Sequence, residues 1–189
     1  MISYTELISL PRLLQAWETF RREKTNKRDV QLFSLHLEDN LFELHTALKW
    51  QTYRHSDYEA FWVHDPKRRH IHKACVTDRV LHHLLYTYLY ELFDPMFIYD
   101  SYSCRLDKGV HRALKRFRSF GRQVSRNNTS TAWVLKMDIG KFFASIDHGI
   151  LLGILKSYVL DTNILWLLEK VIESFSVRPL PQSLPRPGE

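Results

Sequence analysis

The chain has 189 residues, of which 44% are hydrophobic and 25% are charged, a composition that is ordinary for a globular protein with a buried core. Lysine and arginine (27) exceed aspartate and glutamate (21), so the net charge is +6, which suits a polyanionic partner but is also common among proteins without one. The two cysteines are too few for a disulfide framework, and neither a signal sequence nor an apolar run of about 18 residues occurs, so we expect a cytoplasmic protein that does not span a membrane.

Residues 1–60 are predicted to be helical. Apolar side chains recur at helical spacing from Leu10 to Phe20, and a basic run follows at 21–24. A second helix is predicted from Asp29 to Trp50, because leucines supply its apolar positions (Leu32, Leu35, Leu37, Leu41, Leu44 and Leu48). Locally, nothing in this region argues against a packed pair of helices.

Residues 61–74 are predicted to form a β-hairpin. The first strand runs into Asp65-Pro66, where proline presets the backbone of a turn, and the chain returns through 69–72. Three consecutive cations lie at the turn: Lys67, Arg68 and Arg69. On the local pattern alone, a solvated charged turn is the favoured interpretation.

A zinc site is an alternative interpretation of the histidines and the cysteine that follow. A His-x-His pair on a strand can chelate a metal ion, but the spacings fit no common tetrahedral site. Surface histidines near nucleic acid are therefore the favoured interpretation of this set (His70, His72, Cys75, His82 and His83).

Two amphipathic helices are predicted in the next part of the chain. The first begins at Val76 and ends before Asp94-Pro95, and its apolar stripe is assigned to the core. The second runs from Val110 to about Gly121 and is expected to bury Val110, Ala113, Leu114 and Phe117. Its other side carries five cations with no acid between them (Arg112, Lys115, Arg116, Arg118 and Arg122). This face is either a solvated surface or a track for nucleic-acid phosphates.

The segment from Thr131 to His148 is predicted to be a strand, a turn and a helix. Thr131–Leu135 is apolar and rich in strand-forming residues, which predicts a short buried strand with Asp138 at its end. An acid there is costly to bury and useful if a cation is bound. Ser145 and Asp147 are candidate caps for a helix that begins near His148, and acids that only satisfy backbone donors remain the alternative.

Two further helices are predicted, at Ile150–Val159 and Ile164–Phe175, with a break near 161–163. Residues 179–189 hold four of the seven prolines and show no hydrophobic period, so this tail is expected to be irregular.

Taken together, these segments resemble the reverse transcriptases of bacterial retroelements, a group that includes group II intron, retron and diversity-generating types. The central match is Asp138-Ile139-x-x-Phe142-Phe143-x-x-Ile146-Asp147-His148, which is similar to the first catalytic-aspartate motif of that family. Further matches lie upstream in the order of the family, at Pro66-Lys67-x-Arg69-x-Ile71, at Asp78-Arg79-Val80 and at 100–114.

The resemblance implies an α+β fold in four parts: a helical N-terminal extension (1–60), a fingers region with the hairpin and the basic helix (61–125), a partial polymerase palm (126–178) and a proline-rich tail (179–189). The segment 180–183 matches the next family motif only in part, and the later Tyr-x-Asp-Asp motif is absent because no Asp-Asp pair occurs. The chain is therefore expected to be truncated before the second catalytic motif.

The resemblance also implies a two-ion Mg²⁺ site and a substrate site. Asp138 would be the catalytic carboxylate that bridges both ions, and the carbonyl of Ile139 would ligate one of them. The triphosphate of a deoxynucleotide would be held by side chains of the hairpin and by backbone amides after Asp138 (Lys67, Arg69, Lys141 and Phe142). Phe143 would exclude the ribose 2′-hydroxyl.

The expected function is therefore that of a reverse transcriptase fragment, an RNA-directed DNA polymerase that is inactive alone, because one carboxylate is not expected to hold two dications. A second polypeptide would complete the palm. The basic helix is the candidate contact for the RNA template and the DNA primer (Arg112, Lys115, Arg116 and Arg118). The alternative is a non-catalytic nucleic-acid-binding remnant or scaffold.

Overall fold

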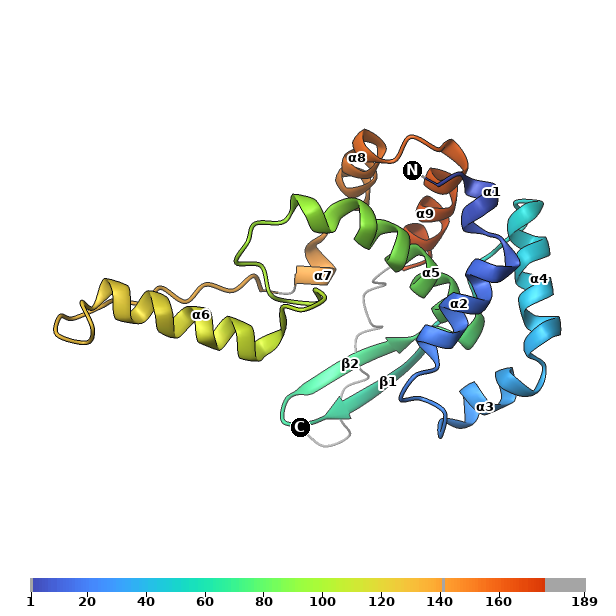
Figure 1. Cartoon of the computed structure of the whole chain (residues 1–189). Coiled ribbons are helices and arrows are strands. Elements are labelled where there is room, and N and C mark those ends of the chain that lie inside the picture. Colours follow the sequence, from blue (N-terminus) through green and yellow to red (C-terminus); the bar gives the residue numbers. More distant parts are fainter. Residues whose placement is uncertain (1, 141, 176–189) are drawn as a thin grey trace, which may run out of the picture. The chain divides into compact units, whose positions relative to one another are not determined.

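The computed structural model describes residues 2–140 and 142–175, which form a mostly helical α+β chain with one antiparallel hairpin (Figure 1). The chain divides into two compact units. The first contains Met1–Tyr88 and Phe143–Glu189, and the second contains Leu89–Phe142. None of the described helices is long and apolar enough to cross a membrane.

The N-terminal helices of the first unit follow the predicted periodicity. Helix α1 spans Tyr4–Leu7 and helix α2 spans Leu10–Phe20, which confirms the first predicted helix. Helix α2 has a proline in its first turn, where the missing N–H costs no hydrogen bond. It buries one stripe of side chains, among them Leu13 and Trp17, and the Trp17 ring lies 4.9 Å from that of Phe33.

The helix predicted from Asp29 to Trp50 is two helices. Helix α3 spans Arg28–Leu35 and helix α4 spans Leu37–Lys49, with a break at His36. At the break the side-chain amide of Asn40 donates to the carbonyl of Phe33, so one of the unpaired carbonyls at the end of α3 is satisfied. The prediction was wrong because the leucine spacing continues across the break.

The hairpin is confirmed. Strand β1 spans Glu59–His64 and pairs antiparallel with β2, which spans Arg68–Lys73. A two-stranded ribbon is marginally stable alone. The base of this hairpin is held by Asp29, whose carboxylate accepts hydrogen bonds from Lys73 of β2 and from Arg79. Burial alone would raise the pKa of Asp29, but these two cations outweigh it and lower the pKa to about 2.

Helix α5 spans Val76–Phe93 and supplies much of the core of the first unit, as its stripe predicts. Two more helices, α8 at His148–Tyr158 and α9 at Thr162–Ser174, also confirm predictions. Their N-caps are Asp147 and Asp161. Asp161 also accepts a hydrogen bond of 2.8 Å from the backbone N–H of Tyr4, which connects α9 to α1.

The second unit is organised differently. It holds a short 3₁₀ turn, η1 at Asp94–Met96, and helix α6 at Gly109–Val124. The short helix α7 at Phe142–Ser145 leads back to the first unit. Among the described residues of this second unit no hydrophobic side chain is buried. The core of the described chain therefore lies in the first unit.

The burial predicted for α6 is wrong. Val110, Leu114 and Phe117 are 73%, 52% and 56% exposed, and Ala113 is half-buried. The helix itself forms as predicted, because amphipathic spacing specifies a helix without specifying what covers its apolar side. In the described part of the second unit nothing buries that side.

Candidate nucleic-acid interface

The residues that the sequence singled out fall into both units. Lys67 and Arg69 lie on the hairpin of the first unit, whereas Asp138, Ile139 and the cationic helix α6 lie in the second. Phe142 and Phe143 stand at the boundary, in α7, and both side chains are exposed. Lys141 lies outside the described residues.

The hairpin carries its cations on different faces. Lys67 lies in the turn between the strands and is exposed. Arg69 is paired with Val63 across the ribbon, whereas Arg68 is paired with His64. Because successive residues of a strand point to opposite faces, Arg68 and Arg69 project from opposite sides of the hairpin. The guanidinium of Arg68 lies 4.0 Å from the centre of the Trp62 ring.

The segment that contains Asp138 is not a strand. Residues 131–139 have no regular secondary structure, and Trp133, Leu135 and Met137 are 92%, 81% and 80% exposed. A strand needs a neighbouring strand to pair its backbone N–H and C=O groups. The described residues supply no such neighbour, since the hairpin strands pair only with each other. The predicted buried strand, and the place of Asp138 at its end, are therefore corrected.

The described residues do not form a two-ion magnesium site. They contain no group of three or more acidic, histidine or cysteine side chains that could hold a metal ion. Asp138 and the carbonyl of Ile139 are adjacent potential ligands, but two hard cations need more oxygen ligands than this pair offers. Asp147 is an N-cap, because its carboxylate accepts a hydrogen bond of 3.0 Å from the N–H of Ile150. Ser145, the other predicted cap, precedes α8 within α7.

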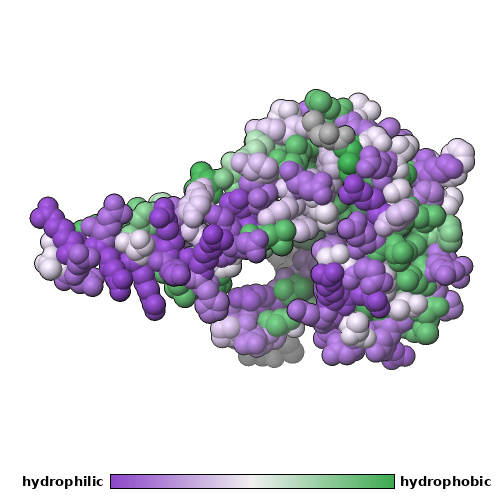
Figure 2. Space-filling view, in the orientation of Figure 1, coloured by the Kyte–Doolittle hydropathy of each residue, from purple (hydrophilic) through white to green (hydrophobic). Residues whose placement is uncertain are grey.

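Helix α6 presents a continuous cationic face, and the α6 region at the left of Figure 2 is mostly hydrophilic on the side drawn. Lys115, Arg118 and Arg122 are exposed, and none has a carboxylate within ion-pair distance among the described residues. Arg112 donates to the backbone carbonyl of Asp107 at 2.6 Å and, among the described residues, forms no ion pair with a carboxylate. These side chains can contact phosphates without first breaking an ion pair.

Arg116 differs from the other cations of α6. It donates to both carboxylate oxygens of Asp100, at 2.9 and 3.4 Å, and its guanidinium lies 4.2 Å from the centre of the Phe120 ring. The hydrogen bond from Arg116, reinforced by one from Tyr102, lowers the pKa of Asp100. Arg116 therefore connects α6 to the loop that precedes it.

A second arginine organises the same loop. Arg105 donates to the carboxylate of Asp94 at 2.7 Å and to the carbonyl of Ile98 at 3.1 Å. Lys108 donates to the carbonyl of Tyr99 and lies 3.9 Å from the centre of the Tyr99 ring. Without a hydrophobic core in the described part of this unit, polar and cation–ring contacts position the start of α6. The sequence identified this segment only through its resemblance to the family.

The first unit contains a buried polar cluster that the sequence did not indicate. Asp78 is 1% exposed and accepts hydrogen bonds from the hydroxyl of Tyr53, at 2.7 Å, and from the N–H of Ser56, at 3.0 Å. The ring of His55 lies 3.5 Å from the same carboxylate, and its Nε2 lies 3.0 Å from Nε2 of His82. Burial, and then the hydrogen bond to Asp78, raises the pKa of Tyr53. This cluster fixes the segment before β1 against α5.

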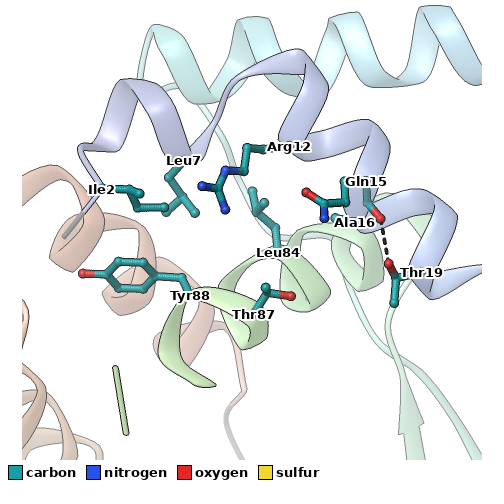
Figure 3. A pocket seen from close by; sticks show the side chains of 9 residues that line it. All are labelled: Ile2, Leu7, Arg12, Gln15, Ala16, Thr19, Leu84, Thr87 and Tyr88. Atoms are coloured by element: carbon teal, nitrogen blue, oxygen red, sulfur yellow. Dashed lines mark hydrogen bonds between the residues drawn. The ribbon is translucent and has the colours of Figure 1, made fainter. Parts of the chain in front are cut away.

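One pocket of the first unit contains none of the predicted site residues (Figure 3). It lies between α2 and α5 and is lined by apolar side chains, including Leu7 and Leu84, and by Arg12 and Gln15. Arg12 already has a partner, the carboxylate of Glu6 at 3.4 Å. The pocket therefore offers no separate chemistry to the candidate interface.

No protein-family model matches the chain. The sequence is 25% identical, over 134 residues, to a protein of Marchantia polymorpha that is named uncharacterized mitochondrial protein ymf11. The match covers 69% of this chain but only 17% of that protein. The chain thus spans less than a fifth of that relative, and the similarity transfers no activity to it.

Proposed function

We propose that this chain binds nucleic acid as the N-terminal part of a reverse transcriptase of the bacterial retroelement type, with an RNA template and a DNA primer as its partners. The observation that carries the proposal is the face of α6 on which Lys115, Arg118 and Arg122 are exposed and lack ion-pair partners in the described chain. Arginine and lysine that release counterions from phosphates supply most of the sequence-independent affinity for nucleic acids. The order of the matching segments supports the family assignment.

DNA synthesis would require more than these residues supply. In the proposed enzyme Asp138 and Ile139 would bind Mg²⁺, and Lys67, Arg69, Lys141 and Phe142 would bind the deoxynucleoside triphosphate. Two magnesium ions need additional carboxylates. We therefore propose that a second polypeptide completes the palm when the chain takes part in catalysis.

A second candidate function is non-catalytic binding of nucleic acid, as a remnant or scaffold. The observation that favours it is the isolation of Asp138, which belongs to no group of three or more potential metal ligands in the described chain. The two candidates share the α6 interface and differ only in whether a partner restores synthesis.

The salt dependence of binding tests the shared part of the proposal. Replacing Lys115, Arg118 and Arg122 by alanine should weaken binding to a primer–template duplex. It should also reduce the slope of log K against log salt by up to about three, because each lost phosphate contact changes the slope by roughly one. Arg116 is kept in this variant, since its loss would also disturb the loop through Asp100.

The matched control removes three exposed cations from the first unit, Arg22, Lys27 and Arg28, which have no ion pair among the described residues. Both variants lose the same net charge, so a difference between them reports the position of the charges. The control should keep the wild-type slope. Equal reductions in both variants would mean that only net charge matters and would overturn the α6 interface.

A further inference from the structure

One face of the hairpin consists of planar and cationic side chains. Residues that are paired across an antiparallel ribbon share a face, so the register gathers five side chains beside Ala60. We call them the stacking face: Trp62, His64, Arg68, His70 and His72. The opposite face carries the apolar pair Phe61–Ile71 and the pair Val63–Arg69.

The planar groups of the stacking face contact one another one after the next along the hairpin. The Arg68 guanidinium lies 4.0 Å from the centre of the Trp62 ring, and the rings of Trp62 and His70 are 4.5 Å apart. The rings of His70 and His72 are 4.4 Å apart, and that of His72 meets the edge of Phe175 at 5.5 Å. A continuous run of planar groups therefore extends from the turn to the base of the hairpin.

The charge and the exposure of this face suit a polyanion that carries aromatic groups. None of its five members is acidic, and Trp62 is 41% exposed. The acidic residue of the ribbon, Glu59, is paired with Lys73 on the other face. Unpaired nucleobases stack on exposed aromatic side chains and on arginine planes, and neighbouring cations contact their phosphates.

We propose that the stacking face binds unpaired nucleobases of single-stranded RNA or DNA. An incoming base takes the position of the Arg68 guanidinium on the indole of Trp62, and the released guanidinium contacts an adjacent phosphate. The inference rests on the proposed function, since it names which part of a nucleic acid the first unit recognises. Cross-strand contacts also stabilise the ribbon itself, so the test must separate binding from hairpin stability.

The test compares Trp62→Leu with Phe61→Leu in the full chain. The two positions are adjacent on β1 and similarly exposed, at 41% and 39%, but they lie on opposite faces. The probes are oligouridylate, oligothymidylate and an abasic oligomer of the same length. Trp62→Leu should weaken binding of both base-bearing oligomers roughly tenfold and leave abasic binding unchanged, because stacking needs a base. Phe61→Leu should change the affinity for the base-bearing oligomers and for the abasic oligomer by no more than about twofold.

Two further measurements keep the result interpretable. Amide exchange across β1 and β2 reports whether the hairpin of each variant is intact, and Trp62→Phe, which restores a planar ring, should recover part of the lost affinity. If the wild-type chain bound base-bearing and abasic oligomers equally well, the proposal that the stacking face binds nucleobases would be wrong, but the proposed function would be unaffected. Absence of binding to every oligomer and to duplex would overturn both.

Discussion

Buried polar residues affect the stability of the first unit and its dependence on pH. Asp78 is almost fully buried, and hydrogen bonds from Tyr53, Ser56 and Cys75 satisfy its carboxylate. A buried carboxylate without such donors would cost several kcal/mol, so these donors are needed for the carboxylate to be tolerated. His82 contacts this cluster through His55, and the burial of its imidazole, more than that contact, makes the stability of the unit dependent on pH.

We expect the folded chain to lose stability as the pH falls through the range in which His82 would ordinarily gain a proton. Burial lowers the pKa of His82 from 6.5 to about 4, repulsion from His55 acts in the same direction, and Asp78 opposes it. Below pH 6.5 the unfolded chain takes up this proton and the folded chain does not, until about pH 4. The expected loss between about pH 7 and about pH 5 is on the order of 2 kcal/mol.

Urea unfolding at the two pH values measures this loss, and His82→Gln, which cannot titrate, should remove most of it. The contribution of Asp29 to the free energy of unfolding does not change between these two pH values. Its pKa is lowered to about 2, so its stabilisation is lost only as the pH falls below 3.8, outside the measured range. A profile of His82→Gln that matched the wild type would show that another group carries the dependence.

The N-cap residues of α8 and α9 differ in the number of hydrogen bonds that their carboxylates accept. Asp147 caps α8 through a single hydrogen bond, from the N–H of Ile150. Asp161 caps α9 through the N–H groups of Asn163 and Ile164 and also accepts from the N–H of Tyr4. Asp147 is exposed and contacts only its own helix, whereas Asp161 connects segments that are 157 positions apart in the sequence.

Removing the two caps should therefore have unequal effects. Asp147→Ala should cost about 1 kcal/mol, the ordinary value of an N-cap, and Asp161→Ala about 2 kcal/mol, because the partly buried hydrogen bond from Tyr4 is lost as well. Denaturant unfolding of both variants gives the comparison. Asp161→Asn, which keeps a capping oxygen, should fall between the wild type and Asp161→Ala. Equal losses at the two positions would show that the link to α1 contributes nothing.

At the scale of the whole molecule, the hydrophobic core lies in one unit, whereas the candidate site residues fall into both. The buried hydrophobic side chains of the described residues belong to the first unit, whereas Asp138 and the cationic face of α6 belong to the second. The second unit instead exposes apolar side chains along α6 and along residues 131–139. Large exposed apolar areas are typical of surfaces that bind another polypeptide. This agrees with the proposal that a partner completes the catalytic palm.

The 189-residue chain alone should make no DNA. Without further carboxylates at the site of Asp138, the lost stabilisation of the transition state should amount to several kcal/mol. Each 1.4 kcal/mol reduces the rate tenfold, so primer extension on an RNA template should fall below detection. A complete reverse transcriptase is the positive control. Robust synthesis by the chain that disappears in Asp138→Ala would show that the site is complete.

The sequence by itself determined most of the local elements. The helices at 10–20, 76–93 and 162–174 follow from apolar periodicity, and the hairpin follows from the turn at Asp65-Pro66. The cap at Asp147 also follows from residue type and position. These features depend on neighbours a few positions away, which a single sequence contains.

Only the tertiary structure decided what each element contacts. The burial of Asp78, the ion pair of Arg116 and the exposure of Trp133 each depend on which other segment lies nearby. The strand predicted at 131–135 illustrates the limit most clearly. Its side chains have the strand pattern, but a strand exists only when another strand pairs with its backbone, and the described chain supplies none.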